Sequence, residues 1–180
     1  MAVKRKSPDG ISTNNLIFSS HIGTNDEIFP LILKLYVADG AKVADVTYGK
    51  GVFWKKVDIN KFEFHPTDIL TGTDCRNLPY DNNSIDCLVL DPPYMHTPGG
   101  TAHASHQNYE QYYQNNAASS AKKYHEAVLD LYFKAAREAA RVLRHKGILI
   151  IKCQDEVCAN KQRLTHVEII NEVVQYGFFI

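Results

Sequence analysis

Short apolar runs alternate along the chain with polar stretches that contain glycine and proline, a pattern typical of alternating strands and helices. Four segments are expected as strands: residues 42–47 (KVADVT), 61–64, 84–90 (SIDCLVL) and 147–152 (GILIIK). All but the second are apolar enough to be buried, and the third suits a strand that is covered on both faces. Strands and helices in alternation predict an α/β domain with a mainly parallel sheet.

Three helices are expected before, between and after these strands. The apolar stretch 29–37 predicts a short helix that ends before Gly40. Its start is left open, because the capping-box pair Thr24 and Glu27 places it earlier than a first-turn position for Pro30 does.

A second helix is indicated by apolar residues at helical spacing, with Gly147 expected to end it: Tyr124, Val128, Leu131, Ala135, Ala139 and Val142. Thr165 and Glu168 are spaced like another capping box, at the head of a third helix that is expected to end at Gly177.

A chain of 180 residues corresponds to one domain. We expect that domain to span residues 1–180, with a flexible polar start over 1–19. A composition of 44% hydrophobic and 22% charged residues excludes a mostly disordered chain. Residues 95–123 form a long polar loop, and such a loop in a compact domain is usually a functional lid or disordered.

Nothing in the sequence predicts a membrane or secreted protein. No apolar run approaches the roughly 20 residues that cross a bilayer, and the charged first residues lack the apolar segment of a secretory signal. The cysteines form no C-x-x-C pair and show no metal-finger spacing. We therefore expect Cys75, Cys87, Cys153 and Cys158 to be reduced thiols of a cytoplasmic protein.

The formal net charge is zero, since 20 Lys and Arg balance 20 Asp and Glu. A dedicated nucleic-acid binder usually carries a basic excess, so the global charge weighs mildly against that class. Local basic clusters remain, and each is either a contact for phosphates or an ordinary solvated surface. They are Lys4, Arg5 and Lys6; Lys122 and Lys123; and Arg137, Arg141, Arg144 and Lys146.

Candidate chemistry lies directly after two of the expected strands, where open α/β sheets bind ligands. The first segment is residues 45–51 (DVTYGKG), whose glycines allow close backbone approach and turns that a side chain would forbid. It lacks the full G-x-G-x-x-G and phosphate-loop patterns. Taken alone, it is either a ligand loop or an ordinary turn.

The second segment is Asp91-Pro92-Pro93-Tyr94. Two prolines stiffen the chain and remove two backbone donors, which leaves carbonyls and the Asp91 carboxylate as fixed acceptors beside an aromatic ring. Such a group suits a planar ligand with an amino group, for example an extruded base. The alternative is a structural turn with a buried tyrosine.

Together these segments resemble the S-adenosylmethionine-dependent amino-methyltransferases that act on adenine-N6 or cytosine-N4 in DNA. D-P-P-Y matches the catalytic motif of that family, and residues 45–51 keep the aspartate and both glycines of its cofactor motif. Thr47 departs from the phenylalanine that is common there. Residues 152–157 (KCQDEV) and 162–168 also look like the end of such a domain.

The resemblance implies a Rossmann-like class I methyltransferase fold and S-adenosylmethionine as the cofactor. The family usually adds a closing hairpin strand near the end, and only Phe178, Phe179 and Ile180 stand at its expected start. Cofactor-binding residues are implied by position: Thr24 for the carboxylate, Asp45, Thr47, Gly49 and Gly51 in the loop, Asp68 for the ribose and Asp74 for the adenine amino group.

The catalytic residues implied are Asp91, Pro92, Pro93 and Tyr94, which would transfer the methyl group directly to a base nitrogen of DNA. Aspartate before Pro-Pro-Tyr is more typical of adenine enzymes. Two alternatives stay open: an RNA base methyltransferase, and an inactive cofactor-binding subunit. No recognition domain is evident, so a separate recognition subunit is a possible partner. No metal is expected, since His96, His103 and His106 fit no tight metal site.

Overall fold

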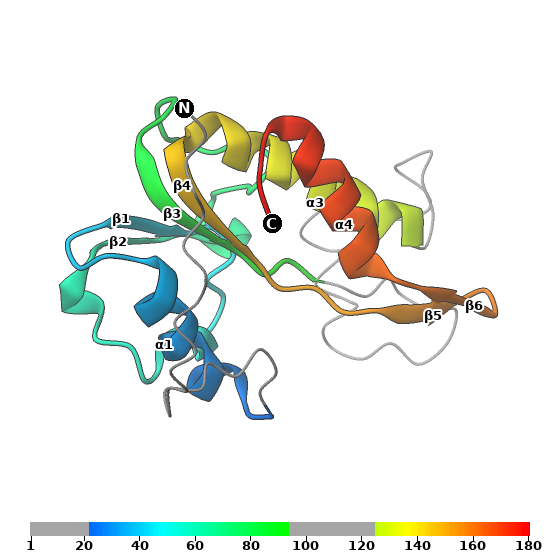
Figure 1. The fold of residues 1–180 in the computed structure, drawn as a ribbon, viewed down its shortest axis with the longest axis horizontal. Helices are drawn as coiled ribbons and strands as arrows, with labels where there is room; N and C mark the ends of the chain where they lie inside the picture. The colour runs from blue at the N-terminus through cyan, green and yellow to red at the C-terminus, as the bar shows by residue number, and fades with distance from the viewer. Residues whose placement is uncertain (1–21, 94–124) are drawn as a thin grey trace, which may run out of the picture.

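A parallel four-stranded sheet forms the centre of the computed structural model, which describes residues 22–93 and 125–180 (Figure 1). The strands lie in the order β2-β1-β3-β4 and all neighbouring pairs are parallel. Their bounds are Lys42–Asp45 for β1, Glu63–Pro66 for β2, Ile85–Leu90 for β3 and Leu143–Ile151 for β4. The predicted α/β class, with a Rossmann-like parallel sheet, is confirmed.

Helices cover both faces of this sheet, so the core has two halves. α3 (His125–Val142) and α4 (Thr165–Val173) lie over one face, and α1 (Asn25–Tyr36) lies over the other (Figure 1). Successive residues of β3 point into alternate halves of the core. Leu88 and Leu90 belong to the half that contains α3. Val89 belongs to the half that contains Phe29 and Leu33 of α1. This alternation follows from the two-residue period of a strand.

α1 begins directly after Thr24, so the capping-box pair and not Pro30 marks the start of the helix. The Glu27 carboxylate accepts the Thr24 N–H at 2.9 Å. Pro30 lies inside the helix. The helix ends at Tyr36, before Gly40 as expected.

The prediction that Gly147 ends α3 is wrong. α3 ends at Val142 and runs directly into β4. Ile85 pairs with Leu143 but Cys87 pairs with Ile148, so residues 144–147 bulge out of the ladder. A Cβ at Gly147 would come within 2.9 Å of the Arg144 carbonyl oxygen, which shows that glycine is needed for the close backbone approach in this bulge.

The second capping box is also wrong, although α4 does begin at Thr165. Glu168 is turned towards α3, with its Oε2 2.9 Å from Nε2 of the buried His125. The other ring nitrogen of His125 lies 2.7 Å from Glu156 Oε1. Thr165 Oγ1 is buried and has no hydrogen-bond partner among the residues that the structure describes.

Glu156 belongs to a small hairpin that the sequence pattern did not predict. β5 (Glu156–Cys158) and β6 (Lys161–Arg163) pair antiparallel. Ala159 and Asn160 join them with φ of 51° and 60°, the left-handed backbone of a tight two-residue turn. His125 therefore ties the hairpin and α4 to the start of α3.

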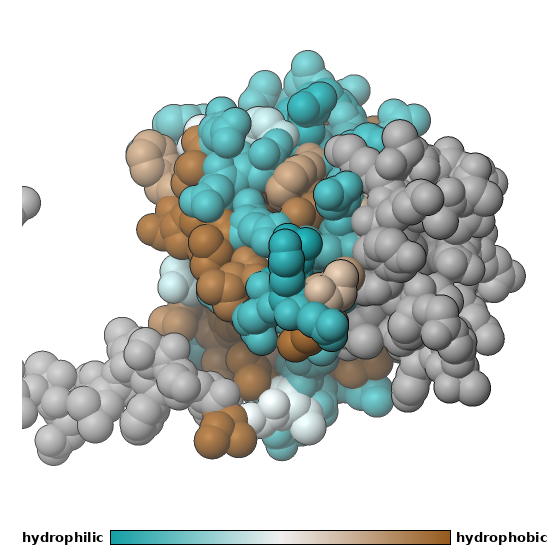
Figure 2. All heavy atoms as spheres, turned by 90° about the vertical axis from the view of Figure 1, so that its right-hand side faces the viewer, coloured by the Kyte–Doolittle hydropathy of each residue, from teal (hydrophilic) through white to brown (hydrophobic). Residues whose placement is uncertain are grey.

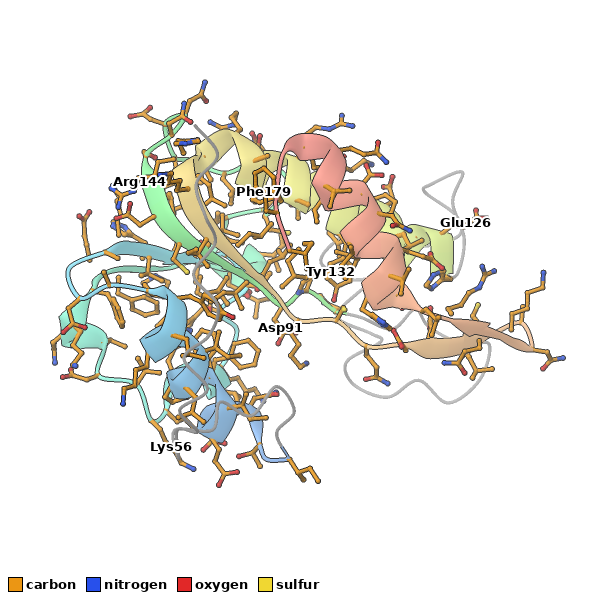
Figure 3. All side chains as sticks on the ribbon, viewed as in Figure 1. Lys56, Asp91, Glu126, Tyr132, Arg144 and Phe179 are labelled. Carbon is orange, nitrogen blue, oxygen red and sulfur yellow. The ribbon has the colours of Figure 1, made fainter. Side chains whose placement is uncertain are left out.

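Residues 177–180 have no regular secondary structure, so the described chain contains no closing strand after α4. β4 is an edge of the described sheet, and a groove of about 880 Å³ lies beside it, lined also by α4 and the last residues. In the view of Figure 2, hydrophobic side chains gather along one side of the molecule. Phe179, labelled in Figure 3, lines the groove and is almost fully exposed.

No helix in the described ranges is both long and apolar enough to span a bilayer. All four cysteines are free thiols, and three of them are buried.

We predict that His125→Leu destabilises the protein more than His166→Leu does. His125 is 2% exposed and contacts two carboxylates, so its loss should cost roughly 3 kcal/mol. His166 makes a similar 2.7 Å contact with Asp155, but half of its side chain is exposed, and its loss should cost under about 1 kcal/mol. Urea unfolding of both variants measures the difference; equal losses would contradict the structural role of His125.

Candidate functional site

The candidate site lies where the chain reverses its direction across the sheet. β2 pairs with one side of β1, and the chain then returns so that β3 pairs with the other side. The loops after β1 and β3 therefore lead away in opposite directions. In open α/β sheets the crevice at such a switch point, at the carboxyl ends of the strands, is where ligands bind. Asp45 is the last residue of β1 and Asp91 follows β3 (Figure 3).

Asp45 fixes the loop that follows β1. It is 3% exposed, and its two oxygens accept hydrogen bonds from the Thr47 N–H at 3.0 Å and the Trp54 indole N–H at 2.6 Å. Burial raises the pKa of Asp45 to about 6; these hydrogen bonds lower it, and the nearby charges of Asp91 and Asp68 raise it further. These bonds fix the backbone after β1, while the assignment of Asp45 to a cofactor loop stays a prediction.

The two glycines of this loop adopt the left-handed backbone that favours glycine. φ is 52° at Gly49 and 65° at Gly51. A Cβ at Gly51 would run into the ring of Tyr48. The Gly49 N–H donates to Asp68 Oδ2 at 3.0 Å, so the loops after β1 and β2 are joined at the crevice.

Thr47 connects the same loop to the segment after β3. Its Oγ1 accepts the backbone N–H of Asp91 at 2.6 Å. This contact gives a physical reason for threonine at a position where the resembled family often has phenylalanine, because a phenylalanine cannot accept this bond. Thr47 therefore links the candidate cofactor loop to the candidate catalytic segment.

Asp91 is a largely buried carboxylate with a cation beside it. Burial raises its pKa, and the Lys152 ammonium, 3.2 Å from Oδ1, acts in the opposite direction. Pro92 is buried and Pro93 half-buried. Tyr94 and the predicted loop 95–123 lie outside the described residues, as does the predicted flexible start 1–19.

Asp74 and Thr24 have local partners instead of contacts with this cluster. Asp74 forms an ion pair with Arg76 at 2.7 Å. Burial acts to raise the pKa of Asp74, but the hydrogen bonds from Arg76 outweigh it and lower the pKa overall. Thr24 precedes α1 and donates to Asp26. No hydrogen bond between described residues joins either of them to Asp45 or Asp91.

Sequence reasoning missed Lys152 and Trp54 as members of this cluster. The sequence held one indication for Lys152. It directly follows an apolar strand, and the carboxyl ends of parallel strands lie at the same edge of the sheet, which is where Asp91 was expected. Trp54 had none, because its indole reaches Asp45 only through the turn after Gly51.

The third basic cluster is mostly occupied by contacts within the protein. The Arg141 guanidinium donates to the carbonyls of Leu78 and Tyr80, and Arg144 pairs with Asp86. These arginines hold the loop before β3 in place. Within the described ranges, no three His, Cys, Asp or Glu side chains converge as a metal site.

No protein-family model matches the chain, and no curated protein matches it. Among solved structures, one similar fold is the crystal structure of the [4+2]-cyclase SpnF, with a TM-score of 0.46 and 16% sequence identity. The match covers 84% of this chain and 56% of that chain, so the protein spans little more than half the length of its structural neighbour. Function must be argued from the site itself.

We predict that Gly51→Ala destabilises the protein more than Gly40→Ala does. Both glycines have positive φ, but a Cβ at Gly40 meets nothing within 4 Å. The control should therefore cost only the backbone strain, about 1–2 kcal/mol, while Gly51→Ala must also displace Tyr48. Unfolding measures the stabilities. Emission of Trp54, the sole tryptophan of the chain, should change only in Gly51→Ala. Equal stabilities and unchanged emission would contradict the close packing of the loop.

We also predict that stability falls between pH 5 and pH 7.5 because of Asp45. Its folded pKa of about 6 lies above the ordinary value of 3.8, so the folded protein binds this proton more tightly than the unfolded chain does. That contribution is complete below pH 3.8 and is lost as the pH rises through about 6, by roughly 1 kcal/mol over this range. Asp45→Asn should flatten the pH dependence; an unchanged slope in that variant would contradict the assignment.

Proposed function

We propose that this protein is an S-adenosylmethionine-dependent DNA methyltransferase that acts on the exocyclic amino group of adenine or cytosine. The observation that carries the proposal is the placement of Asp91. The carboxylate that begins the D-P-P-Y segment lies at the carboxyl edge of the sheet, next to the reversal in strand order. The Thr47 hydroxyl accepts the backbone N–H of Asp91 at 2.6 Å, which joins this segment to the glycine loop.

The residues at the crevice fit the proposed cofactor. Gly49 and Gly51 present backbone without side chains, so a ligand can approach closely. The Asp68 carboxylate accepts the backbone N–H groups of Gly49 at 3.0 Å and Leu70 at 2.9 Å and forms a capping box with Thr71. These bonds fix the carboxylate next to the glycine loop, where the proposal assigns it to the ribose hydroxyls. Asp45, Asp68 and Asp91 also give the crevice the negative charge that suits a sulfonium.

When bound, S-adenosylmethionine supplies a methyl group on a positively charged sulfur. The protein's part is to activate and orient the base nitrogen, whose lone pair is delocalised into the ring. Asp91 and the Pro92 carbonyl accept the two amino hydrogens, which draws the lone pair out of the ring and towards the methyl carbon. The nitrogen would take the methyl group from the sulfonium, which would keep the bonding electron pair, and Asp91 would accept the proton that the amino group releases.

Burial of Asp91 favours this role, because it raises the pKa of the carboxyl and makes the anion a better proton acceptor. Tyr94 is assigned to stacking on the extruded base, which would offset part of the few kcal/mol of unstacking. Holding the nitrogen in line with the breaking bond supplies much of the acceleration.

DNA is proposed as the partner, in a cytoplasmic setting that the free cysteines support. Because Arg141 and Arg144 are held in internal contacts, we do not assign phosphate binding to them. A separate recognition subunit would supply contacts that the described surface lacks.

We predict that Asp91→Ala binds S-adenosylmethionine as the native protein does but transfers methyl groups at least about 100-fold more slowly. Binding is measured by calorimetry. Transfer is measured with a labelled methyl donor on unmethylated DNA and on RNA, followed by digestion and mass identification of the modified nucleosides. Asp39→Ala, which removes an exposed carboxylate paired with Lys61, is the control and should retain activity.

Each outcome of this assay has one meaning. N6-methyladenosine or N4-methylcytosine formed in DNA alone supports the proposal and identifies the base. A product in RNA alone supports the fold and cofactor but overturns DNA as substrate. Cofactor binding without transfer by the native protein favours an inactive subunit. Full activity in Asp91→Ala would overturn the catalytic assignment.

A further inference from the structure

Lys152 and Asp91 are cross-strand neighbours at the edge of the sheet. Leu90 pairs with Ile151 in the β3–β4 ladder, and the next residue on each strand is Asp91 and Lys152. The Lys152 N–H donates to the Leu90 carbonyl at 3.0 Å, so the ladder continues one step past the last paired residues. The side chains then meet, with Nζ 3.2 Å from Asp91 Oδ1.

The backbone of both residues is fixed by neighbouring elements. The hydroxyl of Tyr132, a fully buried residue of α3, donates to the Lys152 carbonyl at 2.9 Å (Figure 3). The Thr47 hydroxyl accepts the Asp91 N–H. The ion pair is therefore not a contact between two mobile surface chains: about a quarter to a third of each side chain is exposed.

The charges around Asp91 make this lysine important. At the end of β1, Asp45 is buried and close enough for the two carboxylates to repel each other, and Asp68 after β2 adds to the negative charge at Asp45. On the β4 side the neighbours are Lys152 and the thiol of Cys153, whose pKa is raised first by burial and further by Asp155 and Asp91. Lys152 is the cation that faces Asp91 among the described residues.

We propose that Lys152 is the positioning residue of the catalytic carboxylate, holding Asp91 ionised and engaging Oδ1 so that Oδ2 is presented to the amino group of the substrate. Its effect on catalysis rests on the proposed function, whereas its effect on the ionisation of Asp91 does not. Without the lysine, nothing among the described residues would offset the effect of partial burial, so the pKa of Asp91 would rise further and the carboxyl would keep its proton to a higher pH. A protonated Asp91 would have lost the negative charge that draws on the amino hydrogens.

The first test measures the ionisation of Asp91 without any reaction. Carboxyl-labelled aspartate is followed by NMR against pH, and the Asp91 signal is assigned by its absence in Asp91→Asn. In Lys152→Met the midpoint of that signal should move upwards by at least about one pH unit, since a cation within 4 Å lowers a carboxyl pKa by that much. Lys152→Arg should restore the native midpoint, and Lys152→Gln replaces Lys152→Met if the methionine variant does not fold.

The second test follows methyl transfer. At pH values below the Asp91 midpoint, kcat of Lys152→Met should fall about tenfold for each pH unit by which that midpoint moves and recover as the pH is raised, while affinity for the cofactor stays unchanged and Lys152→Arg retains activity. Lys134→Met is the matched control: it also removes one lysine that pairs with an aspartate, Asp130 at 2.6 Å, but on α3. It should shift neither the Asp91 signal nor the pH profile.

The two tests separate the two proposals. A shifted Asp91 midpoint in a protein that transfers no methyl group supports the role of Lys152 in ionisation and overturns the proposed function. Native transfer with an unshifted midpoint in Lys152→Met overturns the role of Lys152 alone. A fall in kcat that is the same at every pH would also overturn it, because loss of packing does not depend on the protonation of Asp91.

Discussion

The site depends on one buried carboxylate, Asp45. Its oxygens accept the Trp54 indole and the Thr47 N–H, and both bonds direct the chain back over the end of β1. With Thr47 held in this way, its hydroxyl meets the Asp91 N–H. A side chain that never needs to touch the substrate thus places the one proposed to react with it. Because Asp45 is buried, its bonds compete little with water and can define one geometry.

The same burial creates an electrostatic cost that other residues must balance. Asp45 and Asp91 are close together, and burial disfavours the charged form of each. Lys152 relieves this cost only at Asp91 among the described residues, so the two carboxylates are driven apart in acidity. The pKa of Asp45 is raised to about 6 and its oxygens are bonded within the protein, whereas Asp91 has a cation beside it. Active sites often give two carboxylates different roles by placing them in different surroundings, which separates their pKa values.

The sheet could be predicted from the sequence because β3 is buried on both faces and the second half of β4 packs against both halves of the core, so residues 85–90 and 148–151 are mostly apolar. The order of the strands and the hairpin could not, since they depend on contacts between distant segments. Gly147 and Glu168 show why spacing within the sequence mispredicted a helix end and a capping box. Gly147 lies in the bulge of β4, and Glu168 contacts His125 of α3. His125 lies 43 positions before Glu168, so a capping pattern that spans four residues carries no information about this contact.

Prediction of the site followed the same division. Residues proposed to face a ligand through backbone or strand ends, such as Gly49 and Asp91, leave a signature within a few positions. Residues that act on other protein groups do not. Thr47 looked like a departure from the resembled family, yet its hydroxyl makes a bond that a phenylalanine cannot. Lys152 is 61 positions from the carboxylate it faces. Only the parallel register of β3 and β4 brings the two together, which makes the sheet itself part of the site.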